Sequence, residues 1–380
     1  MKTKLLAPVL AAALACGLAA APAGATPDRA EVQQSLDSLV RKEKFPAALA
    51  AVQAKGRSTS YTSGTGELGK STPVPRDGQV RVGSNTKTFV AVVVLQLVGE
   101  GKVELDAPIE RYLPGLVRGQ GIDGRAITVR QLLQHTSGLP NYTAYIGLEK
   151  FENVQHVYVQ PRELLDRALA HPADFAPGAK WEYSNTNYLL AGLLIERVTG
   201  RPVAEQVTER VIDRIGLRDT YWPEVGDQTI DGRHPHGYVL ADDVSDRVVD
   251  ATELDPSWGW AAGAMISTPS DLNRFFSALL GGRLLGAAQL AQMRTTVEAA
   301  TWPGARYGLG LVSTPLSCGG VYWGHGGDIH GFETRGGVTE DGRGAAVAVT
   351  ALPGTFDKGN AERAALAVLS TVDTALCTSR

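Results

Sequence analysis

The sequence lacks several features that mark common classes of protein. Its 380 residues include only three cysteines and three methionines, and its formal net charge of −3 comes without any run rich in lysine or arginine. Without a basic stripe, the chain has no electrostatic footprint of a nucleic-acid-binding protein. It also contains no Gly-x-Ser-x-Gly segment, which argues against the nucleophile elbow of an α/β-hydrolase.

Long apolar runs are confined to the N-terminus. Two lysines precede an apolar stretch over residues 5–21, and small residues ending at Ala25 follow it. This order is typical of a secretory signal peptide cut before Thr26. An N-terminal membrane anchor, for which the stretch is short, and a lipoprotein signal cut at Cys16 are the alternatives. We predict that residues 1–25 are a signal peptide and that the protein is secreted, without stable membrane insertion.

The scarce cysteines fit export. Once Cys16 leaves with the signal, Cys318 and Cys377 remain as an even pair in an oxidising compartment. We predict that they form a disulfide, which ties the C-terminal tail to a strand near residue 318. Two free buried thiols are the alternative.

Strand patterns lie at both ends of the chain, and helical patterns lie between them. Alternating or apolar segments near 47–68 and 306–352 are separated by glycine-rich turns, as in antiparallel strands. We predict an α+β fold: one antiparallel sheet built from both chain ends, flanked by helices, with a mostly helical insertion. The predicted domains are 26–102 plus 256–380 for the sheet and 103–255 for the helices. A cleft is expected where they meet.

A polar turn begins the most apolar helix that the sequence predicts. Residues 89–98 leave almost no polar face, yet Ser84 and Lys87 lie in the first turn. At a spacing of three, their side chains share one helix face. Burial lowers the pKa of a lysine, so Lys87 could accept a proton from the Ser84 hydroxyl and activate it as a nucleophile. Taken alone, the pattern favours a capping serine and a lysine that reaches solvent.

Two further short motifs follow Ser84 and Lys87 along the chain. A Tyr-Ser-Asn motif at 183–185 precedes a predicted helix, and a His-Gly-Gly motif at 325–327 lies in a predicted strand. With Ser84-x-x-Lys87 they resemble the signature of active-site-serine penicillin-recognising enzymes. The Tyr-x-Asn form is similar to class C β-lactamases and secreted D-alanyl-D-alanine carboxypeptidases. The segments "LLQHTSGL", "APGAKWEYSNTNY" and "YGLGL" extend the resemblance to the carboxypeptidases over the mature chain, which implies a β-lactamase/transpeptidase-like fold.

The resemblance implies a role for each matching residue. Ser84 would form the acyl-enzyme and Lys87 would share or accept its proton. Tyr183 would carry a proton to the leaving group and activate the deacylating water, with a pKa depressed by cationic Lys87. The implied substrate-binding residues are Asn185, His325, Gly326, Gly327 and Trp258, although Trp258 is equally expected as a core aromatic. The oxyanion hole would use the Ser84 amide and one a few residues after His325.

Three positions depart from the carboxypeptidase pattern. Gly326 replaces a usual threonine, Asp328 a usual hydroxylic residue, and Val312 a usual arginine. A pocket for a terminal carboxylate needs donors and positive charge, whereas this one has gained an acid. Arg335 could substitute for the cation or neutralise Asp328.

The predicted function is a secreted serine hydrolase, most like a D-alanyl-D-alanine carboxypeptidase. An esterase, a D-amino-acid amidase or aminopeptidase, and a β-lactamase are alternatives on the same scaffold. A penicillin-binding sensor without turnover is the alternative from another class. We expect a monomer that acts on small peptides, esters or β-lactams and needs no cofactor. No metal site is expected at His234 and His236, which lack a third ligand, and His135 is expected to be a structural residue at a helix end.

Overall fold

The computed structural model describes residues 29–244 and 246–378. The predicted signal peptide and the alternative lipoprotein site at Cys16 lie outside these residues. Within the described ranges, no helix is both long enough and apolar enough to cross a membrane.

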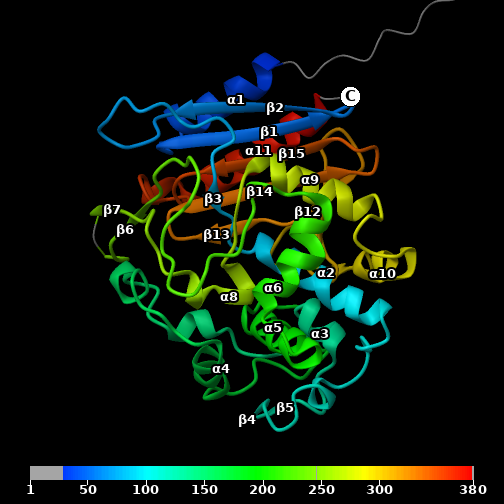
Figure 1. The fold of residues 1–380 in the computed structure, drawn as a ribbon. Coiled ribbons are helices and arrows are strands. Elements are labelled where there is room, and N and C mark those ends of the chain that lie inside the picture. The colour runs from blue at the N-terminus through cyan, green and yellow to red at the C-terminus, as the bar shows by residue number, and fades with distance from the viewer. Residues whose placement is uncertain (1–28, 245, 379–380) are drawn as a thin grey trace, which may run out of the picture.

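A nine-stranded antiparallel sheet joins the two ends of the described chain (Figure 1). The order runs β2 (Arg57–Gly64), β1 (Ala47–Ala54), β15 (Gly344–Val349), β14 (Phe332–Thr339), β12 (Val321–Gly324), β11 (Val312–Pro315), β10 (Arg306–Tyr307) and β9 (Val297–Glu298), with β13 (Gly327–Ile329) also paired to β14. The strand β1 therefore pairs directly with β15, from the opposite end of the sequence. The prediction of one sheet built from both ends is confirmed.

Helices cover both faces of the sheet. On one face, α1 (Arg29–Arg41) and α11 (Ala361–Cys377) pack together over β1 and β15, and on the other lies α9 (Pro269–Leu280) (Figure 1). The strand β15 shows why both faces of the sheet are buried. Val347 and Val349 point into the cluster under α1 and α11, whereas Ala346 and Ala348 point into the cluster beneath α9. Alternate residues of a strand face opposite sides, and here both sides are apolar.

The middle of the chain is mostly helical. It contains α3 (Val129–Leu133), α4 (Pro161–Leu169), α5 (Thr186–Thr199), α6 (Val203–Val207), a π-helical turn (Thr208–Ile212) and α7 (Asp213–Ile215), with the short pairs β4 (Arg118–Gly119) with β5 (Ile122–Asp123) and β6 (Tyr238–Leu240) with β7 (Val248–Asp250). After it come α8 (Trp260–Gly263), β8 (Ile266–Ser267), which pairs with β3 (Val80–Arg81), and α10 (Ala287–Met293). One apolar cluster includes residues from both the sheet part and the helical part of the chain. The division into two domains stays a proposal.

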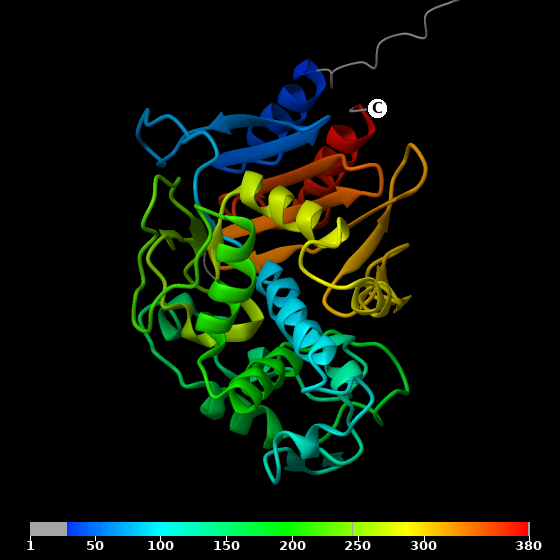
Figure 2. The same cartoon turned by 45° about the vertical axis from the view of Figure 1, so that its right-hand side comes forward.

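The helix α2 (Asn85–Gly99) connects the sheet with this helical region (Figure 2). It packs against α5 and α8. Phe89 and the residues up to Leu95 are fully buried, as the apolar run predicts. The helix therefore carries its first turn to the junction between sheet and helices.

Cys318 and Cys377 are bonded in the structure, with their Cα atoms 5.7 Å apart. The pair joins the end of α11 to the turn between β11 and β12. This is the pairing that the cysteine count predicts.

Candidate active site

Ser84 lies at the N-terminal end of α2, where two glycines let another strand approach. A Cβ on Gly327 of β13 would lie 1.9 Å from the Val82 carbonyl oxygen, and a Cβ on Gly83 would lie 2.9 Å from the Asp328 backbone nitrogen. Gly83 also has a φ of +47°, which most side chains disfavour. These glycines therefore allow β13 to pack directly against the residues that precede Ser84.

Lys87 is fully buried one turn into α2. Its Nζ lies 2.8 Å from Ser84 Oγ and donates a hydrogen bond to the Ala262 carbonyl at 2.7 Å. Burial lowers the pKa of Lys87 well below its ordinary value, although Asp328 acts in the opposite direction. The Ser84 side chain makes no capping hydrogen bond. The alternative of a capping serine and a solvent-reaching lysine is therefore wrong.

The predicted third member, Tyr183, lies beside this pair. Lys87 Nζ is 5.0 Å from the centroid of the Tyr183 ring. Burial raises the pKa of the Tyr183 phenol, and the hydrogen bond with Ser84 lowers it only in part. The expectation of a depressed pKa is therefore wrong: burial penalises the phenolate, and the same burial deprives Lys87 of the stable charge that would favour it. Tyr183 is therefore a protonated phenol near pH 7, which can donate a hydrogen bond and does not ionise in the resting site.

A chain of buried side chains connects the second and third motifs. The Ser184 amide donates to His135 Nδ1 at 3.2 Å, and His135 Nε2 lies 3.1 Å from the Tyr307 hydroxyl. That hydroxyl lies 2.9 Å from His325 Nε2, and His325 Nδ1 lies 2.5 Å from the Gly326 carbonyl oxygen. Burial lowers the pKa of His325 to about 3 and that of His135 well below its ordinary value, with Lys87 adding to both. Both rings are therefore neutral near pH 7.

The direction of each hydrogen bond in this chain follows from its first donor. Because the Ser184 amide can only donate, His135 Nδ1 accepts, and the single proton of this neutral ring lies on Nε2. His135 then donates to Tyr307, Tyr307 donates to His325 Nε2, and the His325 proton lies on Nδ1, facing the Gly326 carbonyl. Sequence reasoning saw His135 only as a helix-end residue and missed Tyr307. The only available signal was its place in "RYGLGL".

Next to His325, three ionisable side chains form a compact group. Arg335 Nη1 donates to Asp328 Oδ1 at 2.6 Å, and its Nη2 lies 3.0 Å from Glu333 Oε1. Burial acts to lower the pKa of Arg335, but Asp328 and Glu333 outweigh it and raise the pKa. Burial raises the pKa of Glu333 to about 8 against the opposing effect of Arg335. Arg335 thus neutralises Asp328.

The remaining predicted residues differ in their surroundings. Asn185 is the N-cap residue directly before α5, and its side-chain amide donates to Asn141 Oδ1 at 3.3 Å. Trp258 is only 7 % exposed and belongs to the main apolar cluster, so its predicted contact with substrate stays a prediction. His234 and His236 form no group with a third potential metal ligand among the described residues.

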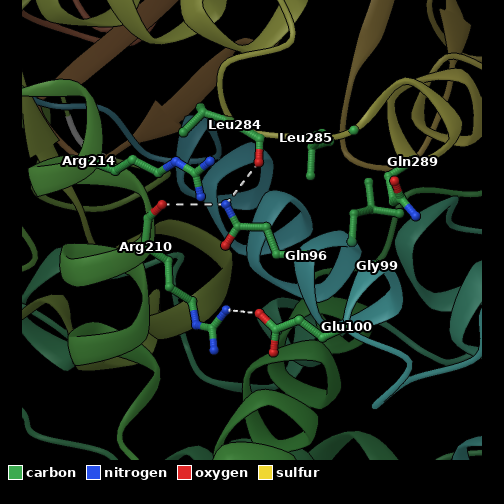
Figure 3. Close-up of a pocket in the computed structure, with 10 residues that line it drawn as sticks. Gln96, Gly99, Glu100, Arg210, Arg214, Leu284, Leu285 and Gln289 are labelled. Atoms are coloured by element: carbon green, nitrogen blue, oxygen red, sulfur yellow. Dashed lines mark hydrogen bonds and ion pairs between the residues drawn. The ribbon is translucent and has the colours of Figure 1, made fainter.

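A separate cavity of about 340 Å³ lies at the other end of α2 (Figure 3). Gln96 crosses it and donates to the Leu284 carbonyl at 3.1 Å, and Arg210 pairs with Glu100 at 2.5 Å. None of the predicted site residues lines this cavity. It therefore does not belong to the group around Ser84.

Comparison with known proteins identifies the family. The sequence profile of the Beta-lactamase family matches residues 32–369. Esterase EstB of Burkholderia gladioli is 33 % identical over 199 residues, which are half of this chain and half of the esterase. A D-stereospecific amidohydrolase from a Streptomyces species is 41 % identical, with a TM-score of 0.80 over 89 % of this chain and 98 % of that one. D-amino acid amidase from Ochrobactrum anthropi SV3 is 28 % identical, with a TM-score of 0.77 over 90 % and 97 %. The chain therefore belongs to the beta-lactamase family of serine hydrolases, and its fold is that of the β-lactamases and transpeptidases.

Proposed function

We propose that this protein is a secreted hydrolase that cleaves small amides and esters through an acyl-enzyme on Ser84, with D-amino-acid amides as its preferred substrates. The carrying observation is the distance of 2.8 Å between Lys87 Nζ and Ser84 Oγ. The lysine is fully buried and forms no ion pair among the described residues. A neutral amine at hydrogen-bond distance from a hydroxyl can act as its general base.

The proposed reaction begins with proton transfer from Ser84 to Lys87. Ser84 Oγ forms a bond to the substrate carbonyl carbon, and the carbonyl oxygen becomes an oxyanion. The amides of Ser84 and Asp328 are our candidates for its hydrogen-bond donors, because β13 packs against the residues before Ser84. The bond to the leaving amine or alcohol then breaks. Tyr183 gives that group its proton and recovers one from Lys87.

Deacylation reverses these roles with water. Water attacks the ester carbon of acyl-Ser84 and transfers one proton to the neutral Lys87 amine. The bond between the acyl carbon and Ser84 Oγ then breaks, Ser84 Oγ takes that proton from Lys87, and the acid product leaves. The raised pKa of Tyr183 suits this cycle, because the phenol stays protonated until a leaving group needs the proton.

The charged group beside His325 favours an amine-bearing substrate over one with a terminal carboxylate. Arg335 already contacts Asp328, Glu333 and the Thr334 carbonyl. It is therefore not free to bind a substrate carboxylate as a fork. The Asp328 side chain is 56 % exposed, and its Oδ2 makes no hydrogen bond among the described residues. That oxygen is available to a substrate ammonium.

Similarity to known proteins also favours D-amino-acid amides as substrates. The match to this chain covers nearly the whole length of the amidohydrolase and of the amidase. It covers only half of the esterase. We therefore favour D-amino-acid amides over the D-alanyl-D-alanine peptides that the motifs first suggested. Esters are the second substrate class.

One experiment tests both the mechanism and the substrate class. The mature protein and its Ser84→Ala variant are incubated with a D-amino-acid amide, its L-isomer, a p-nitrophenyl ester, a D-Ala-D-Ala peptide and penicillin. Turnover and intact mass are followed. We expect fastest turnover of the D-amide, an acyl adduct on the wild type, and neither with Ser84→Ala.

A matched control is Ser58→Ala, which removes an exposed hydroxyl on β2 and should keep full activity. Unchanged activity in Ser84→Ala would exclude Ser84 as the nucleophile. Faster cleavage of the D-Ala-D-Ala peptide than of the D-amide would contradict the proposed substrate class and support the carboxypeptidase hypothesis instead.

A further inference from the structure

A partly exposed tryptophan lies against the predicted proton donor. The Trp302 ring centroid is 5.4 Å from that of Tyr183 and 5.4 Å from that of Trp181. Trp302 is 36 % exposed, whereas Trp181 is 7 % exposed. Water therefore reaches one side of this aromatic group, at Trp302.

The backbone holds Trp302 in this position. Trp302 lies in the connection between β9 and β10. Its amide donates to the Ala299 carbonyl at 2.8 Å, and the Ala305 amide donates to the Trp302 carbonyl at 2.9 Å. Tyr307, which is fully buried, lies beneath with its ring centroid 6.0 Å away. A side chain supported in this way offers a fixed apolar surface and loses little freedom on binding.

The position of Tyr183 indicates which part of a substrate meets this surface. In the proposed reaction, Tyr183 transfers its proton to the departing amine or alcohol. A group bonded to that nitrogen or oxygen leaves along the Tyr183 side of the site, where Trp302 is the exposed aromatic. Flat apolar groups stack well on indole rings.

We infer that Trp302 is a specificity-determining residue that binds the leaving group, and that it favours amides and esters whose leaving group is an aryl or another flat apolar amine or alcohol. This inference rests on the proposed function. The preference for D-amino-acid amides concerns the acyl group of the substrate, whereas this inference concerns its leaving group.

The test compares two leaving groups on one acyl group. A D-aminoacyl p-nitroanilide and the corresponding unsubstituted amide are assayed with wild type, Trp302→Ala and Trp302→Phe. We expect Trp302→Ala to lower kcat/KM for the anilide about tenfold, mainly through KM, and to change the simple amide less than about twofold. Trp302→Phe should keep most of the anilide activity. Leu366→Ala, which removes a 57 % exposed side chain from α11, is the control and should change neither.

A binding measurement separates this inference from the proposed function. In a Ser84→Ala background, calorimetry measures the Kd of the anilide with and without Trp302→Ala, so no turnover is needed. We expect about tenfold weaker binding without the indole. Equal losses for both substrates, or an unchanged Kd, would overturn the role of Trp302 even if Ser84 is the nucleophile. If binding weakens as expected and no substrate is hydrolysed, only the proposed function fails.

Discussion

The hydrogen-bond chain from Ser184 to Gly326 makes a prediction that does not depend on catalysis. If its direction is as derived above, His135 carries its proton on Nε2 and His325 carries its proton on Nδ1. Tyr307 sets this arrangement because its hydroxyl accepts from one ring and donates to the other. Tyr307→Phe removes that hydroxyl and keeps the shape of the ring.

The expected loss of stability follows from the two groups left behind. Without the hydroxyl, His135 Nε2 has a proton with no acceptor and His325 Nε2 has a lone pair with no donor. Each unsatisfied buried group costs about 1–3 kcal/mol, so the two together should lower the free energy of unfolding by about 2–6 kcal/mol. Since the chain links the turn that holds Tyr183 with the His-Gly-Gly segment, kcat should fall about tenfold.

Nitrogen-15 NMR of histidine-labelled protein reads the tautomers directly. At pH 7 the wild type should show His325 as the Nδ1–H form and His135 as the Nε2–H form, assigned with single histidine variants. In Tyr307→Phe, His325 should become a mixture of forms. Tyr322→Phe, which removes a phenol hydroxyl under α11, should leave both rings unchanged. An Nε2–H form of His325 in the wild type, or a charged ring at pH 7, would refute the assignment.

Three further predictions follow from groups described above. His330 directly follows β13, and its ring centroid lies 5.6 Å from that of Trp258. Because burial lowers the pKa of His325 to about 3 and that of His330 to about 4, the unfolded chain binds protons at these two rings before the folded chain does as the pH falls below about 6.5. The free energy of unfolding should therefore decrease. The raised pKa of Glu333, about 8, opposes this only in part, so urea midpoints should be lower at pH 4.5 than at pH 7; a higher midpoint at pH 4.5 would contradict the buried neutral histidines. A Cβ at Gly326 would lie 2.9 Å from Arg335 Nη1, so Gly326→Thr should displace Arg335 from Asp328. The freed guanidinium can then bind a terminal carboxylate, and kcat/KM for the D-Ala-D-Ala peptide relative to that for a D-amino-acid amide should rise about tenfold; an unchanged ratio would contradict this role of Arg335. Thiol titration of the denatured, unreduced protein should find no reactive thiol, and reduction should lower the free energy of unfolding by about 4 kcal/mol; two reactive thiols would exclude the disulfide.

Local sequence was sufficient for some of these features. The apolar run after Lys87 predicts a buried helix whatever packs around it, and the spacing of three fixes the relation of Ser84 to Lys87. Alternating apolar and polar residues near both chain ends predict the strands, because this alternation belongs to each strand by itself and does not depend on which strand pairs with it.

Other features depend on tertiary contacts that no local pattern specifies. Residues 135, 307 and 325 meet only in the fold, so Tyr307 carried no signal of its own. The sign of the pKa shift at Tyr183 was wrong because it depends on how deeply the phenol is buried. The partner of Arg335 depends on the register of β13 and β14, which places Asp328 opposite Glu333.

The pairing of β1 with β15 has a consequence for synthesis. The hydrogen bond from the Ala47 amide to Thr350 Oγ1 spans 303 residues, so the sheet cannot close until nearly the whole chain has left the ribosome. Until then, the hairpin of β1 and β2 exposes an open edge that invites pairing with other chains. A stop codon or proteolytic cut before residue 344 therefore produces an aggregation-prone fragment rather than a smaller enzyme.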